Sequence, residues 1–283
     1  MSSALFAAVT TQAGEFAGAV KQFSQGTADA KYADYNTPSA ALGLPATHDS
    51  FSNDITPFNP HWESSQIVSI GVGGSITLSF ANPVPVNGGP IVGIFSDAGL
   101  IDNSYPDGQT GSVAQTMSRA YGAIPAQRSA LVEVADLSGV LQAVGRFTFV
   151  QPSNAWASST TPYGFTPAGT GTPTDYFKPF TKSLSDFNAL SYEQVSSMLA
   201  GSAGGTWITV PQNLGIQNVS SVRISSPQWA FDDGTYADTY TSGETTYNAV
   251  LSIDTVSAVP EPASAALIVA GMALLHLRRR SRK

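Results

Sequence analysis

The side chains best suited to metal chemistry are two groups of acidic residues in turn-forming sequence. Asp232, Asp233 and Asp238 lie in FDDGTYADTY, and Asp102 and Asp107 lie in DNSYPDG. Carboxylate and carbonyl oxygens at such turns can hold Ca²⁺, although neither spacing matches an EF-hand. Asp and Asn also form turns without metal, because their side chains accept hydrogen bonds from nearby backbone amides. A structural calcium ion and a metal-free turn are therefore both open, and no other cofactor is expected.

Aromatic residues in and beside a long loop suggest a second kind of chemistry. The segment 157–177 is rich in Thr, Gly and Pro and lacks periodicity, which predicts a surface loop. Flat rings on such a loop can stack on sugars, and we single out Trp156 and Tyr163 as ligand-binding candidates. The alternative is that these rings pin the loop onto the core. The neighbouring aromatic residues are Phe165, Tyr176 and Phe177.

The sequence contains no catalytic constellation. It has no cysteine and three histidines, and the order G-x-S-x-G does not occur. His48 and His61 flank HDSFSNDITPFNPHW and are expected on a loop. We therefore predict no catalytic residue and a protein that is not an enzyme.

The elements that would position these side chains are mainly β-strands. Eight or so short β-branched or aromatic segments are bounded by Gly, Pro, Asn or Asp. They predict a mainly β fold: one antiparallel, jelly-roll-like β-sandwich with one or two short helices and long loops. In GGSITLSFA the residues Ile76, Leu78 and Phe80 alternate with polar neighbours and should face the core. QIVSIG precedes this strand across the glycine-rich turn Gly71 to Gly74, which predicts a hairpin.

One helix is predicted at LSYEQVSSMLAG. Ser191 and Gln194 have capping-box spacing, and Gly201 can end the helix. This helix is expected to cover one edge or end of the sandwich. Its apolar stripe is formed by Tyr192, Val195, Met198 and Leu199.

Charge excludes one class of partner. The 283-residue chain carries a net charge of −7, but five of its 13 basic residues lie in the last six positions. The 8 basic and 19 acidic residues before Val259 give that part a charge of −11. Such a body is repelled by nucleic acid and by anionic lipid, so no nucleic-acid partner is expected.

Five segments of the sequence resemble motifs of a group of bacterial cell-surface proteins. In that group an ALG-P turn, a V-SLG-GGSITL-F segment, a VEVS-DG strand and a final D-DAV-AV strand occur in this order. The group's VFEN is replaced here by GIFSD, residues 93–97. The matching segments are AALGLP (40–45), QIVSIGVGGSITLSFANPV (66–84), ALVEVADLSG (130–139), SSVRISS (220–226) and SIDTVSAV (252–259).

The C-terminal tail resembles the PEP-CTERM sorting signal. Its three parts are the motif Val259, Pro260, Glu261 and Pro262, the apolar run Ala263 to Leu277, and the basic cluster Arg278, Arg279 and Arg280. The resemblance implies export, recognition by an exosortase-type membrane protease, and transient membrane anchoring before delivery to the cell surface or extracellular matrix. A 15-residue helix spans about 22 Å, which is short for roughly 30 Å of hydrocarbon. A plain tail anchor is the alternative.

We divide the chain into three parts. Residues 1–19 are expected to be the remnant of a signal peptide or a disordered N-terminus, because Ala4 to Val9 is a short apolar run followed by small residues. Residues 20–257 form the β-sandwich, and residues 258–283 form the sorting signal with its transmembrane helix. The predicted function is a non-enzymatic structural or interaction module at the surface. The alternative is a carbohydrate-binding or carbohydrate-active protein, with a matrix polysaccharide as its partner.

Overall fold

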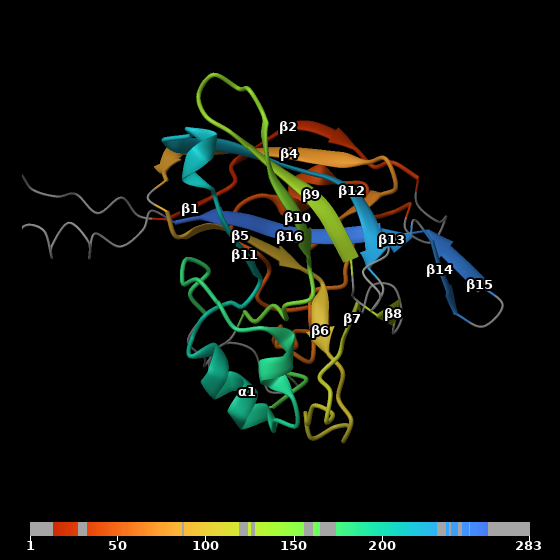
Figure 1. Ribbon diagram of the computed structural model, residues 1–283. Helices are drawn as coiled ribbons and strands as arrows, with labels where there is room; N and C mark the ends of the chain where they lie inside the picture. Colours follow the sequence, from red (N-terminus) through yellow and green to blue (C-terminus); the bar gives the residue numbers. More distant parts are fainter. Residues whose placement is uncertain are drawn as a thin grey trace, which may run out of the picture.

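A computed structural model shows a mainly antiparallel β protein with one α-helix among the described residues (Figure 1). The parts of the chain that the structure describes are residues 14–27, 33–86, 88–118, 124–125, 128–155, 161–164, 174–230, 236–237, 239–242, 245–248 and 250–259. The mainly β prediction is therefore confirmed.

The first sheet is built around the last described strand. Its strand order is β1-β16-β5-β11, and β3 also pairs with β16. All of these pairs are antiparallel. The strands are β1 (Glu15–Phe16), β3 (Val68–Gly71), β5 (Pro90–Ser96), β11 (Thr206–Thr209) and β16 (Val250–Ala258).

The second sheet packs on the first and has the order β10-β9-β12-β4-β2, with β13 paired to β12. Its strands are β2 (Ala19–Ser24), β4 (Ser75–Pro85), β9 (Arg128–Ala135), β10 (Gln142–Thr148), β12 (Asn218–Ala230) and β13 (Tyr236–Ala237). Beside the two sheets lies a separate hairpin of β14 (Thr239–Ser242) and β15 (Thr245–Asn248). Two 3₁₀ helices, η2 (Pro38–Ala41) and η4 (Gln212–Leu214), lie in the connections.

The main core fills the space between the two sheets. The predicted inward face of β4 is confirmed: Ile76 and Leu78 are fully buried and Phe80 is 6% exposed. These side chains meet Ile253 and Val256 of β16 in one apolar cluster. Strict alternation on β4 therefore predicts the core face correctly.

The predicted hairpin between QIVSIG and GGSITLSFA is wrong, because the two strands belong to different sheets. β3 pairs with β16, whereas β4 pairs with β2 and β12. The glycine-rich turn carries the chain from one sheet to the other, and the Gly71 amide donates to the Gln25 carbonyl at 2.6 Å. A Cβ on Gly74 would lie 2.4 Å from that carbonyl oxygen, so this crossing requires glycine.

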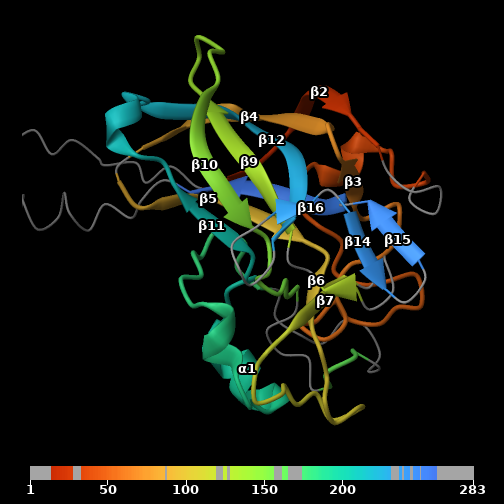
Figure 2. The same ribbon diagram turned by 45° about the vertical axis from the view of Figure 1, so that its right-hand side comes forward.

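A third layer, the lower lobe, covers the face of the first sheet that points away from the second sheet (Figures 1 and 2). It consists of the segment 42–67 that precedes β3, the following elements and the described loops beside them: β6 (Ala98–Leu100), β7 (Thr116–Ser118), β8 (Ile124–Pro125), η3 (Leu184–Phe187) and α1 (Tyr192–Leu199). The lobe has its own apolar cluster, which includes Phe58, Phe187 and Val195.

Helix α1 begins and ends largely as predicted. Ser191 and Gln194 form a reciprocal capping box. Ala200 at the C-cap takes the left-handed conformation at φ 49°, and Gly201 follows it at φ 81°. Tyr192, Val195 and Leu199 are buried on the lobe side, so the helix belongs to the lower lobe. The described parts of the predicted long loop, 161–164 and 174–177, contain no helix or strand.

The two ends of the described chain lie side by side. Glu15 pairs with Ala258 and Phe16 pairs with Ser257, and Ala17 is fully buried. The first sheet therefore includes residues on the N-terminal side of Val20. Among the described residues, no helix has the length and apolar character needed to cross a bilayer. The predicted membrane helix, Ala263 to Leu277, lies outside the described residues.

Replacing a core residue of β4 tests the sheet packing. Leu78→Ala removes a fully buried side chain and should lower the free energy of unfolding by about 2–5 kcal/mol, measured by urea denaturation. Leu137→Ala is the matched control, since Leu137 is 79% exposed, and it should change stability by less than about 0.5 kcal/mol. Equal effects of the two substitutions would contradict the assigned register.

Candidate functional site

Strand β16 has one apolar face and one polar face, and both are buried. Leu251, Ile253 and Val256 point into the main core. The opposite face carries Ser252, Asp254, Thr255 and Ser257, each no more than 1% exposed. Because the lower lobe removes this polar face from water, its side chains need partners within the protein.

Two of these partners are backbone carbonyl groups. The Thr255 hydroxyl donates to the carbonyl of Gly43 at 2.8 Å, and the Ser257 hydroxyl donates to the carbonyl of Tyr176 at 2.8 Å. On the neighbouring strand β5, the carbonyl of Ser96 accepts from the Ser153 hydroxyl at 2.9 Å. Side-chain to backbone hydrogen bonds thus attach the lobe to the first sheet.

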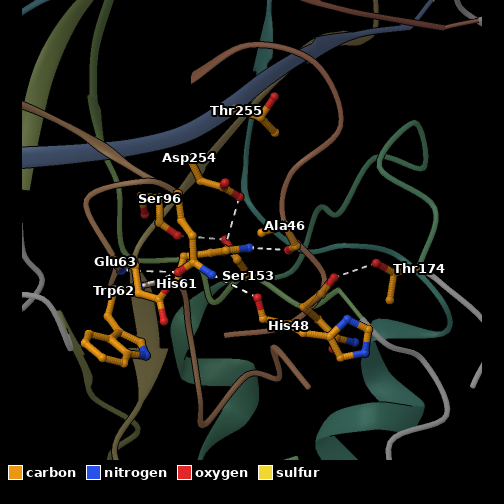
Figure 3. Close-up of polar contacts among 12 residues, drawn as sticks. Ala46, His48, His61, Trp62, Glu63, Ser96, Ser153, Thr174, Asp254 and Thr255 are labelled. Carbon is orange, nitrogen blue, oxygen red and sulfur yellow. Dashed lines mark hydrogen bonds and ion pairs between the residues drawn. The ribbon is translucent and has the colours of Figure 1, made fainter. Parts of the chain in front are cut away.

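The carboxyl group of Asp254 on this face lies against a histidine (Figure 3). His61 Nδ1 lies 3.2 Å from Asp254 Oδ2, and the two side chains are 0% and 1% exposed. On its other side, His61 Nε2 lies 2.6 Å from the carbonyl oxygen of Ala46. The imidazole therefore bridges a loop carbonyl and the central strand.

The geometry requires one proton in this pair. A carbonyl oxygen only accepts hydrogen bonds, so Nε2 of His61 must carry a hydrogen. The lone pair of Nδ1 and the carboxylate of Asp254 would then repel each other unless one proton lies between them. Burial lowers the pKa of His61 to about 4, against the weaker effects of Ala46 and Glu63. Burial, reinforced by nearby Asp97, raises the pKa of Asp254 well above its usual value. Both shifts favour a neutral pair, with the proton on Asp254 rather than on His61.

Asp97 is a second buried carboxylate in this layer. It is 1% exposed and accepts a hydrogen bond from the hydroxyl of Ser118. Burial and then Asp97 raise the pKa of Tyr35, whose hydroxyl donates to the Trp62 carbonyl at 2.8 Å. With no exposed face on either His61 or Asp254, no substrate reaches the pair. It is a structural link between the lobe and the sheet.

The second predicted loop histidine is also paired with an aspartate. His48 Nε2 lies 3.2 Å from Asp54 Oδ1, and these side chains are 26% and 11% exposed. His48 and His61 both lie in the irregular segment before β3, as predicted. In the part of the chain that the structure describes, no group of three or more His, Asp or Glu side chains could hold a metal ion.

The acidic turn at Asp102 is closed by protein donors. Its carboxylate accepts from the backbone amides of Ser104, Gly108 and Gln109 at 2.8–2.9 Å. It also accepts from the Tyr163 hydroxyl at 3.0 Å. These are the hydrogen bonds by which an Asp side chain forms a turn without metal. The other calcium candidates, Asp232, Asp233 and Asp238, lie outside the described residues.

The same turn forms one wall of a surface pocket in the lower lobe, beside the first turn of α1. The cavity measures about 380 Å³ and is lined by residues from three segments, one of which contains Tyr163. The Tyr105 ring, which is 70% exposed, packs edge-on against the Tyr163 ring at 5.0 Å. The other lining residues are Pro106, Asp107, Thr161, Pro162, Ser191, Tyr192 and Glu193.

Tyr163 thus combines the two roles considered for the loop aromatics: it packs against the lobe core and it lines the pocket. Trp156 and Phe165 lie outside the described residues. For Tyr176 the core alternative holds, since its ring is buried against Phe95 at 4.9 Å. Phe177 likewise packs on Phe16 at 4.7 Å.

The sorting motif begins where β16 ends. Val259 is half-buried, and its amide donates to the carbonyl of Ile91 at 2.8 Å. The rest of the motif, Pro260, Glu261 and Pro262, lies outside the described residues, as does the arginine cluster Arg278, Arg279 and Arg280.

No protein-family model and no curated protein matches this sequence. The function must therefore be argued from the residues of the chain itself. The His61–Asp254 pair was missed by sequence reasoning, because the two residues are far apart in the chain. One signal was available: Asp254 interrupts the β-branched and apolar run VLSIDTVSAV, where a carboxyl group needs a buried partner.

Asp254→Asn tests the proton in the buried pair. A raised folded-state pKa means that the protonated carboxyl group stabilises the fold below its unfolded pKa of about 3.9, and that this contribution is lost as pH rises toward the folded pKa. The wild-type protein should therefore lose about 1.4 kcal/mol of unfolding free energy per pH unit relative to the variant across this window. Urea denaturation at several values from pH 5 to pH 8 measures this slope.

The control for this series is Asp136→Asn. Hydrogen bonds from Ser138 lower the pKa of Asp136, which is exposed, so its carboxylate is ionised in both states above pH 5. The stability difference between this variant and the wild type should not change with pH. A flat difference for Asp254→Asn as well would mean that the buried pair holds no proton.

Proposed function

We propose that this chain is an exported bacterial protein whose two-sheet body is a jelly-roll-like β-sandwich carried to the cell surface or extracellular matrix by its tail. The body acts as a non-enzymatic structural or interaction module. The observation that carries this proposal is where β16 ends: the strand runs to Ala258, and Pro260 follows after a single residue. The division between body and tail in the sequence thus coincides with the end of a central strand.

The tail has the parts that a cleavable sorting signal needs. Proline is disfavoured inside a regular helix and biases the residue before it towards extended backbone, so the sequence around Pro260 and Pro262 favours a segment that a protease can bind. The apolar run is short for a bilayer, and Arg278, Arg279 and Arg280 would keep its end on the cytoplasmic side. An exosortase-type membrane protease is the proposed partner. Cleavage near Glu261 would release a body of charge −11 that does not adhere to anionic lipid.

The position of β16 supports removal of the tail without loss of the body. β16 lies between β1 and β5 and its residues 251–258 are all buried. A cut beyond Val259 leaves every one of these contacts in place. Glu15 of β1 pairs with Ala258 of β16. The chain before Gly14 and the chain after Val259 would therefore both leave the body at the same end of these two strands. Both could then reach one membrane surface while the body folds.

Saccharide binding is the second candidate, and the aromatic pocket favours it. Tyr163 and Tyr192 line a cavity of about 380 Å³, within the range of roughly 300–1,000 Å³ that is usual for small-ligand sites. The neighbouring Tyr105 leaves its ring largely exposed. A matrix polysaccharide is the proposed partner for this site.

The C-terminus of the native protein tests the sorting function. Mass spectrometry of the surface-localised protein from its native host should find a C-terminus close to Val259–Pro262. In a host without the protease, the same chain should keep Arg278 to Lys283 and remain in the membrane fraction. The variant Glu261→Ala should delay cleavage in the native host, whereas Glu193→Ala in the body should not. An intact tail on the surface-localised native protein would show that the tail is a permanent anchor.

A further inference from the structure

The pocket in the lower lobe has fixed walls. Gly108, at φ 74°, packs so closely on Pro162 that a Cβ on Gly108 would lie 2.4 Å from the proline ring. The Pro162 carbonyl accepts a hydrogen bond from the Thr56 hydroxyl. The four hydrogen bonds to Asp102 hold the opposite turn and Tyr163 together. Binding of a ligand in this cavity therefore costs little conformational entropy, because the walls are already ordered.

The charged groups of the pocket are all of one sign. Asp107 and Glu193 line it from two different segments, and both are exposed. In the part of the chain that the structure describes, neither carboxylate has a hydrogen-bond or ion-pair partner, and no Lys, Arg or His is among the lining residues. The excess of acids in the body adds to this field. Two full carboxylate charges outweigh the partial positive charge at the N-terminal end of α1, so the pocket repels anions and attracts cations.

The uncharged surface of the pocket suits a ring that carries hydroxyl groups. Tyr163, Tyr192, Pro106 and Pro162 supply apolar and aromatic surface. The faces of tyrosine rings attract ammonium groups and also pack on the C–H surfaces of sugars. The small volume of the cavity fits a short saccharide segment better than a folded partner.

We propose that this pocket binds a protonated amino sugar, a free-amine hexosamine unit of a matrix polysaccharide, with its ammonium group paired to Asp107 and Glu193 and its ring packed on Tyr163. The proposal rests on the saccharide-binding function proposed above and names its ligand class. Neutral sugars leave both carboxylates unpaired, and acidic sugars are repelled by them. The free amine is what distinguishes the expected ligand from other matrix sugars.

Calorimetric titration of the full chain with three oligosaccharides of equal length tests this assignment. The probes are β-1,4-linked oligomers of glucosamine, of N-acetylglucosamine and of glucose, each at low and at high salt. The glucosamine oligomer should bind most tightly and should weaken with salt, because exposed charge pairs are screened. Glu193→Gln and Asp107→Asn should each weaken its binding about two- to fivefold. Tyr163→Ala should weaken it about tenfold.

Asp136→Asn is the matched control, since it removes a carboxylate that follows β9 of the second sheet and does not line the pocket, and it should leave binding unchanged. Circular dichroism melts verify that each variant is folded. Equal binding of glucosamine and N-acetylglucosamine oligomers, insensitive to Glu193→Gln, would overturn the amine assignment and leave saccharide binding in place. Binding of no oligosaccharide at all would overturn both proposals. A lysine peptide that competes as well as the glucosamine oligomer would show that the site recognises amines without the sugar.

Discussion

Burial of β16 on both faces is the constraint on which the rest of the structure depends. A sheet with one wet face needs only one apolar side, but β16 is covered by the second sheet on one side and by the lower lobe on the other. The protein keeps polar side chains on the lobe side, where Thr255 and Ser257 donate to backbone carbonyls and Asp254 faces His61. These pairings hold the lobe on the two sheets, because separating the layers would break the hydrogen bonds that Thr255 and Ser257 donate to backbone carbonyls.

The His61–Asp254 pair meets this constraint without burying a net charge. Two isolated ions in this layer would each carry a large desolvation cost, and even a buried ion pair recovers that cost only with good geometry. A neutral imidazole facing a neutral carboxylic acid avoids it, and the carbonyl of Ala46 fixes which nitrogen of His61 carries the hydrogen. The pair also connects two distant parts of the chain, since it joins the loop before β3 to strand β16, which leads into the sorting motif.

Local patterns in the sequence predicted local structure well. The alternation of Ile76, Leu78 and Phe80 identified a core face, and the spacing of Ser191 and Gln194 identified the start of α1, because both signals act over a few residues. The hairpin prediction failed because a glycine-rich turn has the same appearance whether it joins neighbouring strands or crosses between sheets. The contact that decides between them, Gln25 against Gly74, comes from residues far outside the turn. Tyr163 and Asp107 were each singled out from the sequence, but their meeting with Glu193 in one pocket could not be predicted, because these segments approach each other only in the folded chain.

The central claim is that the buried pair holds its proton on Asp254 and leaves His61 neutral with a hydrogen on Nε2. Nitrogen-15 NMR of the imidazole of His61 tests this most directly, with the weakly buried His48 as an internal comparison. The account predicts one protonated nitrogen, Nε2, and one unprotonated nitrogen, Nδ1, with no change between pH 5 and pH 8, because the pKa of His61 is lowered to about 4. Two protonated nitrogens in the folded protein at neutral pH would place the proton on His61 and contradict the account.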